Sequence, residues 1–238
     1  MPEAIEPAGT AVARTDSEAT AVPTPTPQPT ATATMTATVV PEATATTIPD
    51  PTVTLQPLLR NYTIEPDKSE VRFYIDELLF GNPKTVIGRT SDLSGVLVLD
   101  WNAPTLAEVG PIQINALDLR TDDSFRNRAM RFQILESAEE AYQFILFTPT
   151  AVSGLPTTPI VAGESYQFEL TGGLTIRDIT QTETFVMTVT AVSETELNGF
   201  GETVVLRSDY DLDIPSVPGV ANVADEVRLE IDFVALGE

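Results

Sequence analysis

Pairs of neighbouring carboxylates, such as Asp122-Asp123 and Asp225-Glu226, could in principle carry out acid–base chemistry. A general acid and a general base need ionisable groups that lie close together in the folded chain. Adjacent acidic residues in a turn or at a helix cap are a common structural alternative, in which their side chains bond the local backbone. The sequence favours this structural interpretation, because nothing else that catalysis needs accompanies either pair.

The residue types that most enzymes depend on are missing. The chain has no His and no Cys, which removes the commonest general base, thiol nucleophiles and the usual ligands of zinc. It also has no glycine-rich phosphate loop and no acidic cluster with metal-ligand spacing. We therefore expect a protein that is not an enzyme and that uses no metal and no cofactor.

A cluster of three arginines is the second candidate for chemistry. Arg126, Arg128 and Arg131 lie within six positions of a chain that has only 13 basic residues. They can pair with Asp122, Asp123 and carboxylates of nearby strands, or a member of the cluster can face the head group of a ligand. We carry Arg126 and Arg128 forward as possible head-group contacts.

The net charge of −22 excludes several partners. Nucleic-acid binding depends on basic residues that neutralise phosphates, and anionic membrane surfaces repel an acidic protein for the same reason. No run of about 18 apolar residues is present that could span a membrane as a helix. No signal peptide is visible, and we expect that these 238 residues begin after a cleavage site and that the protein is extracytoplasmic.

Composition divides the chain near residue 60. Residues 1–59 contain no aromatic residue and are rich in Thr, Pro and Ala, most clearly in residues 23–34. Such a segment has nothing bulky to bury, and alternate prolines favour extended geometry, so we predict a disordered stalk or linker. Its composition resembles that of mucin-like stalks, and glycosylation is left open. Residues 60–238 are then the folded domain.

Strands dominate this second part. Apolar and polar residues alternate in residues 166–171 and again in residues 184–191, as is typical of strands with one buried face. Arg177-Asp178 lies between these two runs and predicts a tight turn, with Asp178 suited to its corner. Residues 142–149 also predict a strand, but they are apolar on both faces.

One short helix is predicted after residue 124. Residues 121–124 offer several N-caps, and Phe125, Ala129 and Phe132 recur at the spacing of one helical face. With about eight antiparallel strands and this helix, the pattern predicts an all-β barrel or sandwich. A barrel of about eight strands can hold one small ligand.

Five blocks in residues 61–238 together form a distinctive pattern. The blocks are residues 62–73 (Tyr62-Thr63-Ile64 through Phe73), 114–128, Gly173 to Thr180, Leu206 to Tyr210, and Val223 to Val227. In their order and spacing, which make the resemblance specific, they resemble the YceI-like domain family of bacterial, mostly exported, lipid-binding proteins. The sequence departs from the family at Lys68, Asp178 and Asp209-Tyr210-Asp211, where His, Gly and Asp-Phe-Gly are more usual.

The resemblance implies a lipocalin-like antiparallel β-barrel with an elongated apolar cavity for a polyisoprenoid or an isoprenoid quinone. Alternation selects the inward residues, although it does not separate a lined cavity from a packed core. The expected lining residues are Val71, Phe73, Ile75, Ile112, Ile114, Phe144, Leu146, Phe168, Leu170, Phe185, Met187, Val189, Leu229 and Ile231.

Two functions remain open at this point. The first is non-enzymatic binding, transport or sequestration of an isoprenoid-type lipid or quinone in the barrel. The second is a structural or protein-interaction module, displayed at the cell surface, whose barrel is filled by its own side chains. The volume of the cavity distinguishes the two, and the sequence leaves the oligomeric state undetermined.

Overall fold

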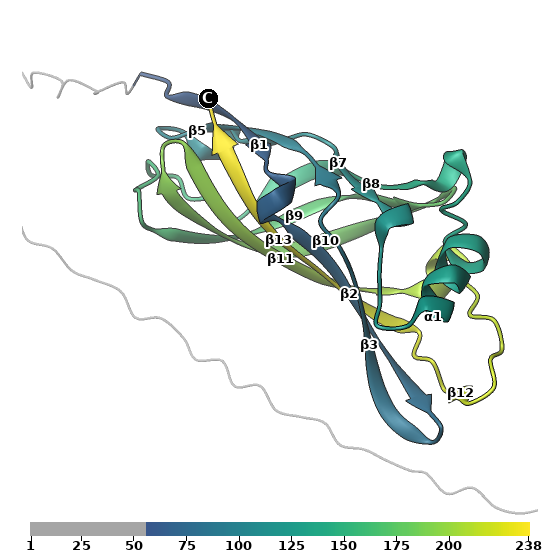
Figure 1. Cartoon of the computed structure of the whole chain (residues 1–238). Helices are drawn as coiled ribbons and strands as arrows, with labels where there is room; N and C mark the ends of the chain where they lie inside the picture. The colour runs from purple at the N-terminus through teal and green to yellow at the C-terminus, as the bar shows by residue number, and fades with distance from the viewer. Residues whose placement is uncertain (1–55) are drawn as a thin grey trace, which may run out of the picture. The chain divides into compact units, whose positions relative to one another are not determined.

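The computed structural model describes residues 56–238, and these residues form a sheet of 13 strands with one short α-helix (Figure 1). Nearly all of the predicted stalk lies outside the described residues. The strands are β1 (Leu59–Ile64), β2 (Glu70–Leu79), β3 (Asn82–Thr90), β4 (Leu93–Ser94), β5 (Val96–Asp100), β6 (Glu108–Val109), β7 (Ile112–Asn115), β8 (Phe144–Ser153), β9 (Ser165–Ile176), β10 (Ile179–Ser193), β11 (Glu196–Leu206), β12 (Val220–Ala221) and β13 (Glu226–Gly237).

The sheet closes on itself. Its strands follow the order β4-β7-β8-β9-β10-β11-β13-β1-β5-β6, with antiparallel pairing throughout. β4 and β5 lie on either side of Gly95 in one stretch of chain, and β4 pairs with β7 whereas β5 pairs with β1. This stretch therefore joins the two ends of the sheet, and the predicted lipocalin-like antiparallel barrel with one short helix is confirmed.

The last strand, β13, pairs with two different strands along one of its edges. Along one edge β13 pairs with β11, but along the other it pairs with β2 at residues 228–232 and with β1 at residues 235–237. Ser69 fills the break between β1 and β2, since its hydroxyl donates to the Glu65 carbonyl at 2.7 Å and accepts from the Val234 N–H at 3.1 Å. One side chain thus satisfies backbone groups that the ladder leaves unpaired.

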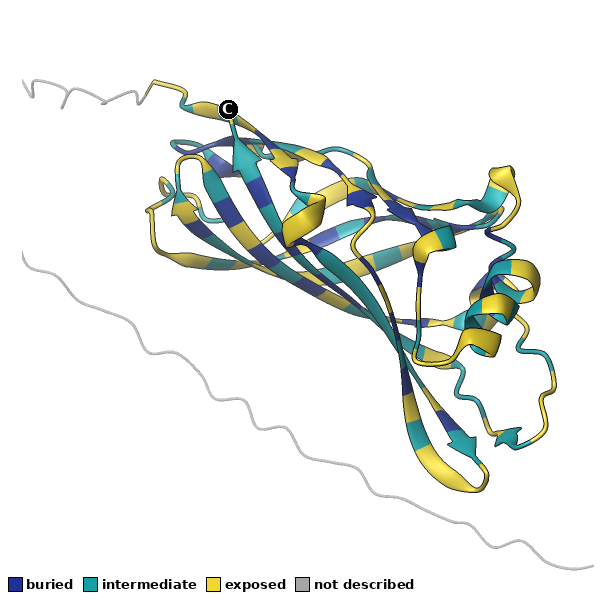
Figure 2. Cartoon of the chain, viewed as in Figure 1, coloured by how far each residue is buried: buried dark blue, intermediate teal, exposed yellow. Residues whose placement is uncertain are grey.

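The residues of β9 and β10 that point into the barrel are the predicted ones. Leu170 and Met187 are buried, and burial alternates along these strands in Figure 2. On the outer face, Thr171 and Thr184 lie opposite one another and their hydroxyls are hydrogen-bonded at 2.8 Å. The period-two pattern of the sequence therefore identified the core face correctly.

The predicted turn lies where expected, but its corner residue differs. Ile176 pairs with Ile179, which leaves Arg177 and Asp178 as the two turn residues. The residue with positive φ is Arg177, at 58°, and not Asp178. This backbone directs the Arg177 side chain to Glu136, at 3.4 Å, and over the ring of Tyr142, so tertiary contacts outweigh the local preference of Asp.

The helix lies where it is predicted, but its apolar stripe does not pack against the barrel. α1 (Ser124–Ala129) is capped by the Asp123 side chain, but Phe125 and Phe132 are 83% and 61% exposed. Met130 is buried instead, and a π-helical turn from Met130 to Ile134 follows. Because Arg126 and Met130 form the face toward the barrel, and the wider turn rotates the residues after Ala129, the 125/129/132 stripe points away from the barrel.

Candidate functional site: an apolar cavity in two chambers

Inward side chains of the barrel surround an apolar cavity of about 190 Å³. Most of its lining comes from alternate residues of the strands, because strand side chains point to opposite sides of the sheet. We call this the barrel chamber. Its predicted lining residues are Val71, Phe73, Ile112, Ile114, Phe168, Leu170, Phe185, Met187, Val189, Leu229 and Ile231.

A second cavity of about 160 Å³ adjoins the barrel chamber. Residues from β2, α1 with its π-helical turn, and the segment after β11 line it, so we call it the helix chamber. The two chambers share walls made by Phe73, Leu119, Ile145, Ile176 and Leu229. The hollow interior is therefore elongated, and the predicted lining residue Ile75 belongs to the helix chamber.

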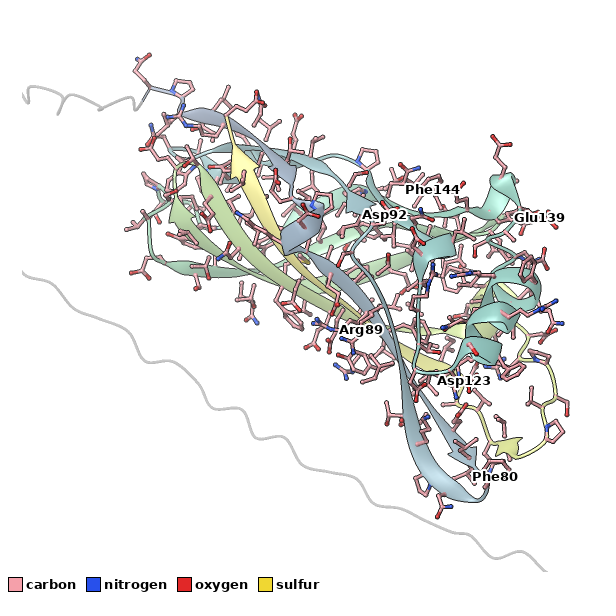
Figure 3. All side chains as sticks on the ribbon, in the orientation of Figure 1. Phe80, Arg89, Asp92, Asp123, Glu139 and Phe144 are labelled. Atoms are coloured by element: carbon pink, nitrogen blue, oxygen red, sulfur yellow. The ribbon has the colours of Figure 1, made fainter. Side chains whose placement is uncertain are left out.

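Two predicted lining residues lie outside both chambers. Phe144 and Leu146 are 39% and 36% exposed on the outer face of β8, where Phe144 is labelled in Figure 3. Their neighbours Ile145 and Phe147 face inward, because they pair directly with Ile114 and Ile112. The sequence of β8 alone does not show which of its residues point inward, since both of its faces are apolar. Its pairing with β7 decides this.

Sequence reasoning also missed lining residues on strands other than β8. Leu174 and Ile176 continue the alternation of β9, and Phe233 continues that of β13, so the same period-two signal could have identified them. The residues from β5 and β6, such as Leu97 and Val109, carried no comparable signal, because these strands are short.

Arg126 brings charge into the wall of the helix chamber. Its guanidinium donates to the Glu77 carboxylate at 2.9 Å and to Asp122 at 2.7 Å, and the Arg126 and Glu77 side chains are 19% and 6% exposed. Asp122 also accepts from the Lys84 ammonium at 2.6 Å, and this contact is the main reason that the pKa of Asp122 is lowered. The wall thus contains a compensated ion cluster.

A second polar group in the helix chamber lies around Tyr210. Tyr210 is fully buried, and its hydroxyl donates to the Glu183 carboxylate at 2.8 Å. Burial, reinforced by this hydrogen bond, raises the pKa of Tyr210 well above its usual value, so the hydroxyl stays protonated. Arg207 lies beside it and donates to the carbonyls of Ala224 and Leu212 at 3.1 and 3.0 Å.

Arg128 does not reach either chamber. It is exposed on α1, and its guanidinium lies 5.9 Å from the centre of the Phe132 ring. Its predicted role as a head-group contact is therefore not supported by its position, because the helix turns Arg126 and not Arg128 toward the barrel. Arg126 remains a candidate.

Three of the four carboxylates in the two pairs have structural partners. Asp122 belongs to the ion cluster and Asp123 caps α1, accepting the Arg126 N–H at 2.8 Å. Asp225 bonds the N–H and the hydroxyl of Ser208, chiefly through the hydroxyl, which lowers the pKa of Asp225. Within residues 56–238 no group of three acidic side chains is arranged to hold a metal ion. In the same residues, no helix has the length and apolarity that crossing a membrane requires.

Comparison with known proteins fits this geometry. The family model of the YceI-like domain matches residues 62–235. The chain belongs to the YceI-like domain family. The match covers the barrel from β1 to β13, so the two chambers lie inside the YceI-like domain. No curated protein matches the chain in sequence.

Two solved structures share the fold of this chain. BcnA of Burkholderia cenocepacia has a TM-score of 0.56 at 18% identity, over 72% of this chain and 98% of BcnA. A polyisoprenoid-binding domain of Saccharophagus degradans, implicated in plant cell wall breakdown, has a TM-score of 0.54 at 16% identity, over 74% of this chain and 98% of that domain. At these identities the likeness concerns the fold.

Proposed function

We propose that this protein binds an isoprenoid-type lipid, a polyisoprenoid or an isoprenoid quinone, inside the barrel, and carries or sequesters it without catalysis. The observation that carries the proposal is the elongated apolar interior formed by the barrel and helix chambers. Membership of the YceI-like family and the likeness to a polyisoprenoid-binding domain support the same class of ligand.

The energetics of an apolar cavity favour an occupant. An unfilled cavity costs about 24 cal/mol per Å³, so a space of 190 Å³ costs about 4 to 5 kcal/mol. Each buried CH₂ group of a ligand gains about 0.8 kcal/mol, and ten such groups gain about 8 kcal/mol, against an association cost of about 4 kcal/mol or more. A long hydrocarbon chain therefore binds with few polar contacts.

Extracytoplasmic placement is part of the proposal. The Thr/Pro/Ala-rich composition of residues 1–59 is that of a spacer between an exported domain and an anchor. A carrier on such a spacer would exchange lipid at the cell envelope. Protease accessibility in intact cells, compared with that in lysed cells, tests this placement directly.

The first test is native mass spectrometry of the full chain, expressed in bacteria and purified without detergent. We expect a discrete added mass that organic extraction releases as an isoprenoid or a quinone. A protein that is free of added mass and that neither polyprenol nor quinone stabilises thermally would contradict lipid binding. That outcome would favour the interaction module instead.

A further inference from the structure

The two chambers differ in polarity, and the difference orients a ligand. The barrel chamber is largely apolar. Arg72 and Glu230 at its wall are bonded to one another at 3.1 Å, and the hydroxyl of Tyr166 accepts the Val161 N–H at 2.8 Å. The helix chamber carries Glu77, Arg126 and Tyr210. A polar head costs free energy when it is buried without hydrogen bonds. If a lipid occupies both chambers, as the proposed function requires, its head belongs in the helix chamber and its hydrocarbon chain in the barrel chamber.

The positive charge of Arg126 is already balanced. Its two terminal nitrogens donate to Glu77 and Asp122, one on each side. Glu77 is almost completely buried, so solvent screens its charge little. Any anion placed against Arg126 from the chamber would therefore also lie close to the Glu77 carboxylate.

The other cation of the helix chamber is also engaged. Arg207 donates to two backbone carbonyls, and its Nε lies 3.9 Å from the Asp225 carboxylate. Tyr210 donates its hydroxyl hydrogen to Glu183, which adds a further negative charge behind the wall. The carboxylates in contact with the chamber's polar residues, Glu77, Asp122, Asp225 and Glu183, thus outnumber the cations beside them, Arg126, Arg207 and Lys84.

We infer that the bound lipid has an uncharged polar head, such as a hydroxyl or a quinone carbonyl, and that Glu77 sets this specificity by excluding a diphosphate. A diphosphate would bring its negative charge into a space where like charges repel and solvent is scarce. A neutral oxygen suits the site, because each guanidinium has five N–H donors and the contacts of Arg126 use two of its terminal nitrogens.

Binding of two ligands with the same hydrocarbon chain tests the inference. Delipidated full-length protein is titrated with a polyprenol and with the matching polyprenyl diphosphate. We expect the polyprenol to bind at least about tenfold more tightly. Equal binding, or tighter binding of the diphosphate, overturns the inference, whereas failure of both ligands to bind contradicts the proposed function itself.

Glu77→Gln tests the residue. It removes one negative charge and leaves an amide oxygen that can accept from Arg126. We expect its affinity for the diphosphate to rise at least about tenfold and that for the polyprenol to stay within about threefold. Glu202→Gln, an identical change of charge on the exposed outer face of β11, is the matched control and should alter neither affinity. If Glu77→Gln behaves like this control, Glu77 does not set the specificity.

A second variant covers the case in which Glu77→Gln fails to fold. Asp122→Asn removes the other carboxylate that balances Arg126, and the Asp122 side chain is 59% exposed, so the change leaves the buried ion pair with Glu77 intact. We expect this variant to bind the diphosphate more tightly than the wild type does, because Arg126 is then no longer fully balanced, and to bind the polyprenol unchanged. Unchanged rejection of the diphosphate by Asp122→Asn would contradict the charge argument.

Discussion

The indole N–H of Trp101 donates a hydrogen bond of 2.7 Å to the hydroxyl of Tyr62, and both side chains are buried. The Tyr62 hydroxyl in turn donates to the carbonyl of Glu194 at 2.8 Å. Tyr62 lies in β1, Trp101 follows β5, and Glu194 lies between β10 and β11. This chain of bonds therefore ties three parts of the barrel together at one end.

Tyr62→Phe should destabilise the fold by about 1 to 3 kcal/mol, because it leaves the buried Trp101 N–H and the Glu194 carbonyl without their partner. Urea denaturation measures the change in the free energy of unfolding. Tyr166→Phe removes an exposed bond to the Val161 N–H and is the control, with an expected cost below about 1 kcal/mol. Equal costs for the two variants would contradict the importance of burial.

Val189→Trp should reduce the amount of lipid that copurifies with the protein. Val189 lines the barrel chamber, so the larger ring occupies space that the hydrocarbon chain needs. Val186→Trp, three positions earlier on the outer face of the same strand, should retain the lipid. Mass spectrometry of the extracted lipid per protein gives the comparison. Equal lipid content in two folded variants would contradict binding in this chamber.

Phe147→Ala should cost about 3 to 5 kcal/mol of unfolding free energy, and Phe144→Ala about 1 kcal/mol or less. Phe147 is 4% exposed and packs edge to face against Phe185, with ring centres 5.1 Å apart, whereas Phe144 lies on the outer face. Chemical denaturation of both variants checks the phase of β8. The reverse order would show that the phase is wrong.

Gly88→Ala should both destabilise the protein, by about 1 to 3 kcal/mol, and weaken lipid binding. An added Cβ at Gly88 would overlap the ring of Phe73, which forms part of the wall of both chambers. Gly173→Ala is the control, since its Cβ would meet only the methyl group of Thr180, at 3.1 Å. Thermal unfolding and lipid content provide the two readings, and an unchanged lipid content in Gly88→Ala would contradict the role of Phe73.

Acidification should destabilise the protein partly through Asp100. Its buried carboxylate accepts the N–H groups of Leu58 and Asn102, and these bonds, the Leu58 bond first, lower the pKa of Asp100. A lowered folded-state pKa gives stability that is complete above the ordinary value of 3.8 and is lost as the pH falls below it. Asp100→Asn should therefore lose less stability than the wild type between pH 6 and about pH 3, as followed by denaturation at each pH. A parallel loss in both proteins would contradict this contribution.

Local patterns predicted the barrel and most of its lining, because strands with one buried face alternate between apolar and polar residues. The alternation around Leu170 and Met187 identified the inner surface of β9 and β10. The sequence of β8 does not alternate in this way, since Ile145 and Leu146 are both apolar, and its inner face is set by pairing with β7.

The polar part of the site depends on contacts that no local pattern contains. Glu77 and Arg126 are 49 positions apart and meet because α1 packs against the end of β2. Their pairing turns the helix so that Phe125, which belongs to the apolar stripe of residues 125, 129 and 132, faces solvent. Arg177 likewise adopts a left-handed backbone through its contact with Glu136.

The divided pairing of β13 has a consequence for how the chain reaches its native state. Thr63 of β1 pairs with Leu236 of β13, so closure of the barrel joins segments from opposite ends of the domain. Contacts of such long sequence separation slow folding. Until β13 is available, the edges of β1 and β2 that pair with it in the folded barrel have no partner strand and can pair with other chains. We therefore expect this barrel to refold more slowly than a domain of similar size whose contacts are local.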